Sequence, residues 1–322
     1  MPLFFYRLDH QVAQLDNPDL VRVHLRSVDI AARESRPVIR FVHADPALPI
    51  VDPRVFTIEG SCDGILLLSY HTRLYACNPC TRRWGRLPPL HVDNDIIGFY
   101  GHGPFNKREY RVLYHPKIQE PDRRYWIFSL SFLDQPVRYI GRPTNLEAID
   151  LVLAHGIVPS YWMPPTTIEH RVHWRPQVAQ DNSNVLMFDT IAEAFRWIPP
   201  PRQLEGTRWV EVEGDQLLEI NGMLAMTLIS QTLVDVWVLQ EGEIFGGSTV
   251  LVVSQERDVL AQCPHIILQT DNGGNVLKFY TLAGHLTVLS RYTLQESLLM
   301  HAFLPMQQGD AIDGDPPFLQ GP

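Results

Sequence analysis

The chain has 322 residues, of which 45% are hydrophobic and 20% charged, a composition typical of folded globular proteins that excludes an intrinsically disordered chain. Its formal net charge is −9, and the lysines at 107, 117 and 278 form no basic run, so nucleic-acid binding is disfavoured. No segment nears the roughly 18 consecutive apolar residues of a membrane helix. We therefore expect no membrane partner and a location in the cytoplasm or nucleus.

Short runs of alternating apolar and polar residues follow one another along the chain. Each is bounded by Gly, Pro, Asn, Asp or Ser, and this pattern predicts strands of about five residues, many joined as hairpins. One segment, 145–155, has the spacing of a short helix, although loop or strand also fits it. The fold class is predicted to be all-β. The runs include VRVHL (21–25), GILLLSY (64–70), YRVLY (110–114), NVLMF (184–188), VDVWVL (234–239) and VLKFY (276–280).

Two segments repeat each other without a gap. LYACNPCTRRWGRLPP (74–89) aligns with VLMFDTIAEAFRWIPP (185–200), and each contains a strand, a polar turn, a second strand and a final Pro-Pro. A third copy, VLKFYTLAGHLTVL (276–289), follows the same order of strand, turn and strand. Units that recur in this way indicate a repeat architecture.

The alignment gives individual residues equivalent places. Cys77 falls on Phe188, and Trp84 falls on Phe195. In the third copy Phe279 takes the Cys77 place. A place that two copies fill with phenylalanine is predicted to face the core.

Each repeated unit is a small antiparallel sheet that cannot bury both of its faces alone. Packing such sheets around an axis buries them, so we predict a β-propeller of about six blades over residues 1–305. Three N-terminal strands and LLMHAFLP (298–305) are expected to close it as one composite blade. Residues 306–322 are polar and rich in Gly and Pro, and a disordered C-terminal tail is predicted there.

A series of motifs extends over nearly the whole chain, from about residue 2 to about residue 305. Their order and spacing resemble the F-box-associated, kelch-like β-propeller domain of plant F-box proteins, in the large family expanded in grasses. The motifs are GSCDGILLLS (60–69), YACNPCTRRWGRLPP (75–89), GFYGHGPFNKREYRVLYH (98–115), HRVHWRP (170–176), NVLMFDTIAEAFRWIPPP (184–201), LLEINGMLAM (217–226), VDVWVLQ (234–240) and ESLLMHAFLP (296–305).

The resemblance implies a non-catalytic protein-interaction module, the target-recognition domain of a substrate receptor in an SCF-type cullin E3 ubiquitin ligase. Members of that family carry an N-terminal F-box that binds a Skp1-like adaptor. This sequence begins at MPLFFYRLDH with no Leu-Pro-x-Glu-type segment. We therefore expect the F-box to be absent from it, and the adaptor to be a partner only if an F-box lies upstream. The family's acidic, Trp-containing strand pair is replaced at 241–258, where we expect an irregular blade.

Cys77 and Cys80 have the Cys-x-x-Cys spacing of zinc and redox sites. A zinc site needs two further ligands, and Cys62 and Cys263 are single and distant in sequence. A thioredoxin-like motif needs its first cysteine at a helix N-terminus, whereas the pattern here is strand, turn and strand. We interpret Cys77 as a core residue and Cys80 as a turn residue.

Metal-ligand patterns are weak elsewhere in the chain. His170 and His173 lie three apart on a predicted strand, which points them to opposite faces. Asp310, Asp313 and Asp315 resemble a calcium loop but lack an acid at its twelfth position. We predict no metal, no cofactor and no catalytic residues, hence no enzyme.

Two alternatives to an intact receptor domain stay open. One is a metal-dependent or hydrolytic enzyme on the same propeller. Its only support is the analogy of fold with enzymes such as galactose oxidase. The other is a truncated F-box relative without ligase function.

Tyr161 and Trp162 are the candidate contact residues for a protein target. They lie in a Pro-rich connection rather than in a predicted strand, and exposed aromatic residues dominate interface energetics. Further contacts are expected from the long connections at 115–124, 141–168 and 202–215.

Overall fold

The structure of the chain is a computed structural model. The predicted irregular blade at 241–258 and tail at 306–322 lie outside the residues it describes, as do the short segment at 145–155 and, apart from Leu304, the predicted closing strand at 298–305. The described residues are 3–9, 20–29, 34–44, 56–70, 73–81, 83–90, 94–104, 107–116, 125–130, 137–141, 165–174, 185–198, 216–220, 223–229, 234–239, 259–263, 266–270, 276–281, 286–293 and 304.

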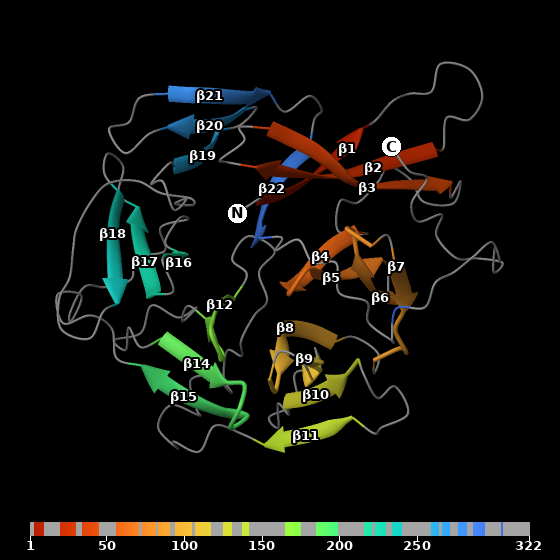
Figure 1. Cartoon of the computed structure of the whole chain (residues 1–322), viewed down its shortest axis with the longest axis vertical. Helices are drawn as coiled ribbons and strands as arrows, with labels where there is room; N and C mark the ends of the chain where they lie inside the picture. The colour runs from red at the N-terminus through yellow and green to blue at the C-terminus, as the bar shows by residue number, and fades with distance from the viewer. Residues whose placement is uncertain are drawn as a thin grey trace. The chain divides into compact units, whose positions relative to one another are not determined.

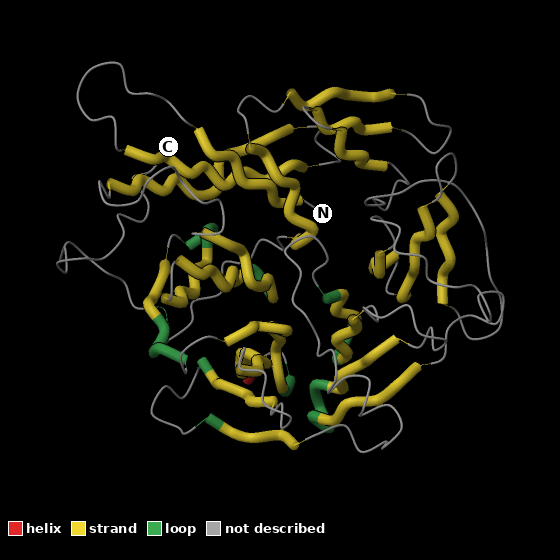
Figure 2. Tube along the Cα trace, turned by 180° about the vertical axis from the view of Figure 1, so that it is seen from behind, coloured by secondary structure: helices red, strands yellow, loops and turns green. Residues whose placement is uncertain are grey.

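The described chain is built of β-strands joined by turns, as Figure 2 shows. Every paired strand is antiparallel to its neighbour, and the strands form six sheets of three or four strands within these residues. No α-helix occurs among them, and none of the described segments is a helix long and apolar enough to cross a membrane. The all-β fold class is confirmed.

The strands divide between two compact units, of which unit 1 is formed by Met1–Pro89 and Glu256–Pro322. It holds three of the sheets, whose strand orders are β22-β1-β2-β3, β4-β5-β6-β7 and β19-β20-β21 (Figure 1). The strands are β1 (Leu3–Asp9), β2 (Leu20–Asp29), β3 (Glu34–Ala44), β4 (Phe56–Cys62), β5 (Ile65–Tyr70), β6 (Arg73–Asn78), β7 (Arg83–Arg86), β19 (Val259–Cys263), β20 (Ile266–Thr270), β21 (Val276–Thr281) and β22 (Leu286–Thr293).

Unit 2 is formed by Leu90–Gln255. Its sheets have the orders β11-β10-β9-β8, β12-β13-β14-β15 and β16-β17-β18. The strands are β8 (Asn94–His102), β9 (Glu109–Pro116), β10 (Tyr125–Ser129), β11 (Arg138–Gly141), β12 (Thr166–Ile168), β13 (Arg171–Trp174), β14 (Val185–Asp189), β15 (Ala194–Ile198), β16 (Gln216–Ile220), β17 (Met223–Ile229) and β18 (Val234–Leu239).

Strands from the two ends of the chain share one sheet in unit 1. β22 pairs with β1, and β1 pairs in turn with β2. A composite sheet of strands from both ends was predicted, and among the described strands its C-terminal member is β22, whereas the predicted strand at 298–305 is left untested. The third copy at 276–289 contains two strands as predicted, β21 and β22, but these do not pair with each other as in the first two copies, because β21 pairs with β20 and β22 joins β1. An alternating pattern specifies a strand and its two faces, but not which neighbouring edge it joins.

The two ungapped copies adopt the same hairpin. In β6 and β7, Cys77 lies directly across from Trp84. In β14 and β15, Phe188 lies directly across from Phe195, as the alignment requires. Cys77 is 3% exposed and Phe188 0%, so both fill the core place that was predicted for them.

The turns of these hairpins are also equivalent. The Asn78 side-chain oxygen accepts the backbone N–H groups of Cys80 and Thr81 at 3.0 and 3.2 Å. The Asp189 carboxylate accepts those of Ile191 and Ala192, both at 2.9 Å. Asn and Asp favour turns because their short side chains can hold the next backbone N–H groups in this way.

The core of unit 2 lies between the β8–β11 and β12–β15 sheets. Its middle is aromatic, and the Trp174 indole N–H donates to the Ile97 carbonyl at 2.8 Å, so its only polar atom is satisfied on burial. This contact ties the two sheets together. The buried cluster comprises Ile97, Tyr100, Leu113, Tyr125, Ile127, Val172, Trp174, Leu186, Phe188 and Phe195.

Candidate functional site

The two cysteines of the Cys-x-x-Cys motif do not form a reactive pair. Cys77 and Cys80 are both free thiols. Burial raises the pKa of Cys77 to about 12, so its thiol stays protonated at physiological pH, whereas Cys80 lies half-buried in the turn. Among the residues described, no group of three or more His, Cys, Asp or Glu side chains could hold a metal ion.

This difference predicts selective alkylation. In the native protein at about pH 8, iodoacetamide is expected to modify Cys80 at least about tenfold faster than Cys77, because only an accessible thiolate reacts. Tandem mass spectrometry of the peptide that carries both cysteines measures the two rates. Unfolding in urea should abolish the difference, and equal rates in the native protein would contradict the buried position of Cys77.

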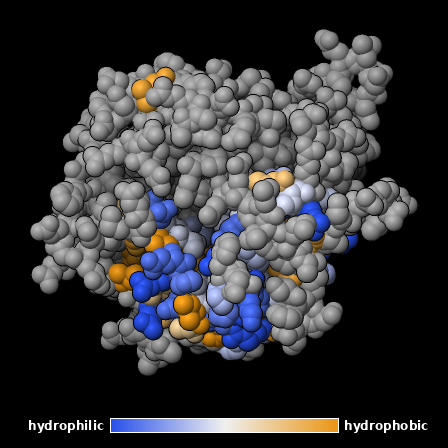
Figure 3. All heavy atoms as spheres, in the orientation of Figure 1, coloured by the Kyte–Doolittle hydropathy of each residue, from blue (hydrophilic) through white to orange (hydrophobic). Residues whose placement is uncertain are grey.

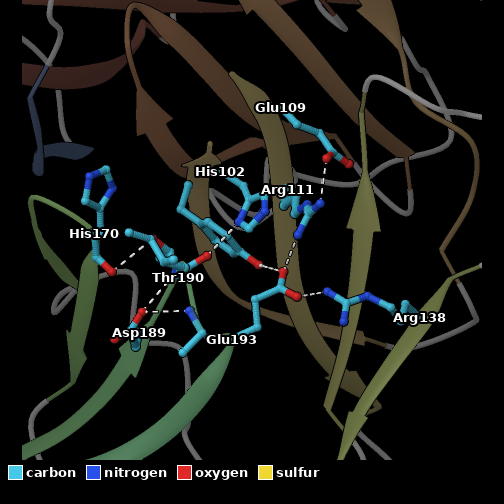
Figure 4. A network of polar contacts seen from close by, with 11 residues as sticks. His102, Glu109, Arg111, Arg138, His170, Asp189, Thr190 and Glu193 are labelled. Atoms are coloured by element: carbon cyan, nitrogen blue, oxygen red, sulfur yellow. Dashed lines mark hydrogen bonds and ion pairs between the residues drawn. The ribbon is translucent and has the colours of Figure 1, made fainter. Parts of the chain in front are cut away.

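A polar network occupies one end of the two sheets that enclose the core of unit 2 (Figure 4). The β8 and β9 strands of one sheet bring His102, Glu109 and Arg111 to this end, and β11 brings Arg138. The turn between β14 and β15 in the other sheet brings Thr190 and Glu193. The network therefore joins hairpin ends from two neighbouring sheets.

Glu193 is the centre of this network. Its Oε1 accepts the Tyr100 hydroxyl at 3.1 Å and also accepts Arg111 Nη1. Its Oε2 forms an ion pair with Arg138. The Glu193 side chain is only 9% exposed, and such a buried carboxylate stays charged only where cations and hydrogen-bond donors surround it.

The backbone at Glu193 is held in the left-handed region, with φ at +50°. This conformation costs a residue with a Cβ atom roughly 1–2 kcal/mol, and glycine or asparagine usually occupies it. The last residue of this four-residue turn is instead a glutamate, whose carboxylate reaches two arginines. The position therefore keeps its side chain despite an unfavourable backbone.

Backbone groups connect the two sheets next to Glu193. His102 Nδ1 lies 2.7 Å from the Thr190 carbonyl oxygen. Thr190 in turn donates its backbone N–H and its hydroxyl to the His170 carbonyl, at 2.8 and 2.9 Å. These bonds fix the β14–β15 turn against the end of β8 and against the β12–β13 turn.

The electrostatics of the network favour the charged form of Glu109. Burial raises the pKa of Glu109, but hydrogen bonds from Arg111 and Ser129 and the charges of Arg111 and His102 outweigh it and hold this pKa below its usual value. Arg111 Nη2 lies 2.5 Å from Glu109 Oε2. Burial also raises the pKa of Tyr100, so this hydroxyl remains a donor to Glu193.

An open pocket of about 400 Å³ lies beside the network on the β8–β11 sheet. Tyr139, on its wall, is 45% exposed and packs on Trp126 with ring centroids 5.5 Å apart. Ile191 at the tip of the β14–β15 turn is 62% exposed. Figure 3 shows hydrophilic side chains over these two sheets, with hydrophobic side chains beside them. The pocket is lined by Glu109, Arg111, Ile127, Ser129, Val137, Arg138 and Tyr139.

The contact residues predicted from the sequence fall outside the described part of the chain, whereas the two histidines considered as metal ligands fall inside it. Tyr161 and Trp162 lie outside the described residues, and so do almost all of the three long connections named with them. His170 lies in a turn, and His173 is 4% exposed with its Nδ1 3.1 Å from the Thr166 carbonyl oxygen. Neither histidine belongs to a group of three or more potential metal ligands within the described residues.

Sequence reasoning missed the pocket and its network. An apolar Ile191 within the polar turn DTIAEA is a local signal of an exposed contact. Glu193 gives a second signal once the hairpin register is known, because it stands where glycine is favoured. Nothing local in the sequence connects Glu193 with Arg111, because that pairing depends on how two sheets pack.

Most of the chain matches a known protein family. A family model described as an F-box associated beta propeller domain matches residues 43–289, well over half of the chain. The chain belongs to this family. Its fold is thus a β-propeller, as predicted. A search of the curated proteins finds no match.

Solved structures similar to this F-box associated domain share little sequence with it. The β-propeller domain of the Trilobed protease from Pyrococcus furiosus is 9% identical, with 91% of this chain and 100% of that chain covered and a TM-score of 0.32. A structural genomics protein of unknown function from Bacteroides thetaiotaomicron is 10% identical, with 89% and 80% covered and a TM-score of 0.36. Likenesses at this level carry no argument about function.

Proposed function

We propose that this F-box associated domain is a non-catalytic module that binds a target protein. In this proposal it serves as the recognition part of an SCF-type cullin ubiquitin ligase in the cytoplasm or nucleus, as in the plant family that its sequence resembles. Membership of the F-box associated propeller family supports the proposal. The Skp1-like adaptor would contact an F-box, and the propeller would contact the target.

The observation that carries the proposal is the open pocket beside Tyr139 in unit 2. The pocket lies on a hydrogen-bonded sheet, and ion pairs of Glu193 with Arg111 and Arg138 connect this sheet to the neighbouring one beside the pocket. A half-exposed tyrosine on such a scaffold is a typical interface anchor, because it buries a large area with little loss of conformational freedom.

Site-specific photo-crosslinking tests this function. The full chain would carry a benzophenone side chain at position 139 in cells, with position 196 as the matched control, because Arg196 is exposed in the same unit but does not line the pocket. We expect position 139 to capture a discrete protein and position 196 not to. The captured protein should then bind the purified chain, and Tyr139→Ala should weaken that binding by about tenfold or more.

Experiments in the same cells distinguish target binding from the ligase role. Co-purification of a Skp1-like adaptor and a cullin with the tagged chain supports the ligase role, and loss of the captured protein's ubiquitination on depletion of the chain completes it. A target without the adaptor would remove the ligase role but keep target binding. Crosslinks from position 196 but not from position 139 would contradict the assignment of the pocket as the binding surface.

A further inference from the structure

The charged side chains at the pocket differ in how many of their hydrogen-bonding atoms already have a partner within the protein. Arg111 gives one Nη to Glu193 and the other to Glu109, and its side chain is 15% exposed. Glu193 is bonded through both carboxylate oxygens. These two side chains form a closed network that offers a ligand little additional hydrogen bonding.

Arg138 is the exception. Its side chain is 53% exposed, and within the described part of the chain its Nη2 alone is engaged, in an ion pair with Glu193 Oε2. Among the described residues its guanidinium makes no further hydrogen bond, and it forms part of the pocket lining. A guanidinium has five N–H donors in a planar fork that matches a carboxylate. Arg138 can therefore keep its ion pair with Glu193 and still bind a second anion.

The same arrangement disfavours a cationic ligand. The two carboxylates at the pocket are 18% and 9% exposed, and arginines already neutralise both of them. A lysine or arginine from a partner would meet Arg138 before it met either carboxylate, and like charges repel. The charge that this pocket presents to solvent is positive, although the whole chain is acidic with a net charge of −9.

Apolar residues line the pocket together with Arg138. Ile127, which is 3% exposed, lies directly across from Arg138 in the β10–β11 ladder, and Val137 and Tyr139 belong to the same lining. An apolar environment strengthens a charge-assisted hydrogen bond and excludes competing water. An apolar side chain next to the ligand's anion would bury its surface against Tyr139.

We infer that this pocket recognises an acidic residue of the target protein, an aspartate or glutamate next to an apolar residue in an extended segment, with Arg138 binding the carboxylate and Tyr139 packing on the apolar neighbour. The inference rests on the proposed function and names the chemistry of its partner. Glu193 is a positioning residue in this arrangement, because it orients Arg138 and leaves the outer donors of the guanidinium toward the pocket.

Fluorescence anisotropy with a defined probe tests the inference. The purified full chain would be titrated with a labelled peptide of sequence Gly-Glu-Phe-Glu-Leu-Glu-Gly and with its isostere Gly-Gln-Phe-Gln-Leu-Gln-Gly. We expect the acidic peptide to bind at least about tenfold more tightly. Arg138→Gln should remove this preference, and Arg138→Lys should restore only part of it, because lysine keeps the charge but not the fork. Arg196→Gln, the matched exposed arginine, should change nothing.

Other outcomes overturn the inference. Equal affinity for the two peptides, or unchanged acidic preference in Arg138→Gln, would exclude carboxylate recognition at this pocket. Displacement of the peptide by single-stranded RNA at equal charge would assign the surface to polyanions in general. If the protein captured at position 139 binds the chain, and binds the Arg138→Gln variant with the same affinity, the inference fails while the proposed function stands. Thermal unfolding of each variant excludes misfolding as the cause.

Discussion

Phe188→Ala is expected to lower the free energy of unfolding by about 3–5 kcal/mol. Phe188 is 0% exposed, and its ring centroid lies 5.0 Å from that of Phe195 and 5.7 Å from that of Tyr100. Truncation therefore leaves a cavity between the β8–β11 and β12–β15 sheets. Strands held by ladder hydrogen bonds cannot move in to fill it, so the loss includes both the transfer and the cavity contributions. Equilibrium unfolding of the full chain in urea measures it.

The same hairpin supplies the control for this prediction. Ile191, three residues further on, is 62% exposed, and Ile191→Ala should change the free energy of unfolding by no more than about 0.5 kcal/mol. Phe188→Leu keeps most of the volume and should lose about 1.5 kcal/mol or less. A loss below about 1 kcal/mol in Phe188→Ala would show that the two sheets do not share a packed core at this place.

The part of the fold that local pattern determines was predictable. Aligning two stretches of sequence placed Cys77 and Phe188 at the same core position, and both are buried. The reason is that side chains alternate between faces along a strand, and a turn of fixed length sets the register of the returning strand. Asn78 and Asp189 confirm this, because equivalent residues make equivalent turns.

The parts that depend on long-range pairing were not predictable. β22 follows β21 after a short connection, yet it pairs with β1 from the opposite end of the chain. The pocket has the same origin, since Arg111 and Glu193 are 82 residues apart and meet only because the two sheets pack. A sequence without alignment partners shows each residue's type but not its distant neighbour. Tyr161 and Trp162, the aromatic contacts predicted from sequence, lie outside the described residues, whereas the half-exposed Tyr139 was not predicted.

Glu193→Ala is expected to lower the free energy of unfolding by about 3 kcal/mol, at the low end of the range for removing one partner of a buried ion pair. Arg111 would keep only Glu109 while remaining mostly buried, and the Tyr100 hydroxyl would lose its acceptor. Arg138 reduces the loss, because its half-exposed guanidinium can return to water. Urea unfolding at low and high salt measures the effect.

Glu193→Gly separates the side chain's contribution from that of the backbone. Glycine loses the same ion pairs as alanine, but it adopts a φ of +50° without the cost that a Cβ atom brings. Its loss should therefore be smaller than that of Glu193→Ala by about 1 kcal/mol. Glu193→Gln keeps an acceptor for Tyr100 and Arg111 and should fall between wild type and alanine. If alanine and glycine were equally destabilising, the left-handed backbone would carry no cost, and if neither were destabilising, the network would not hold the two sheets together.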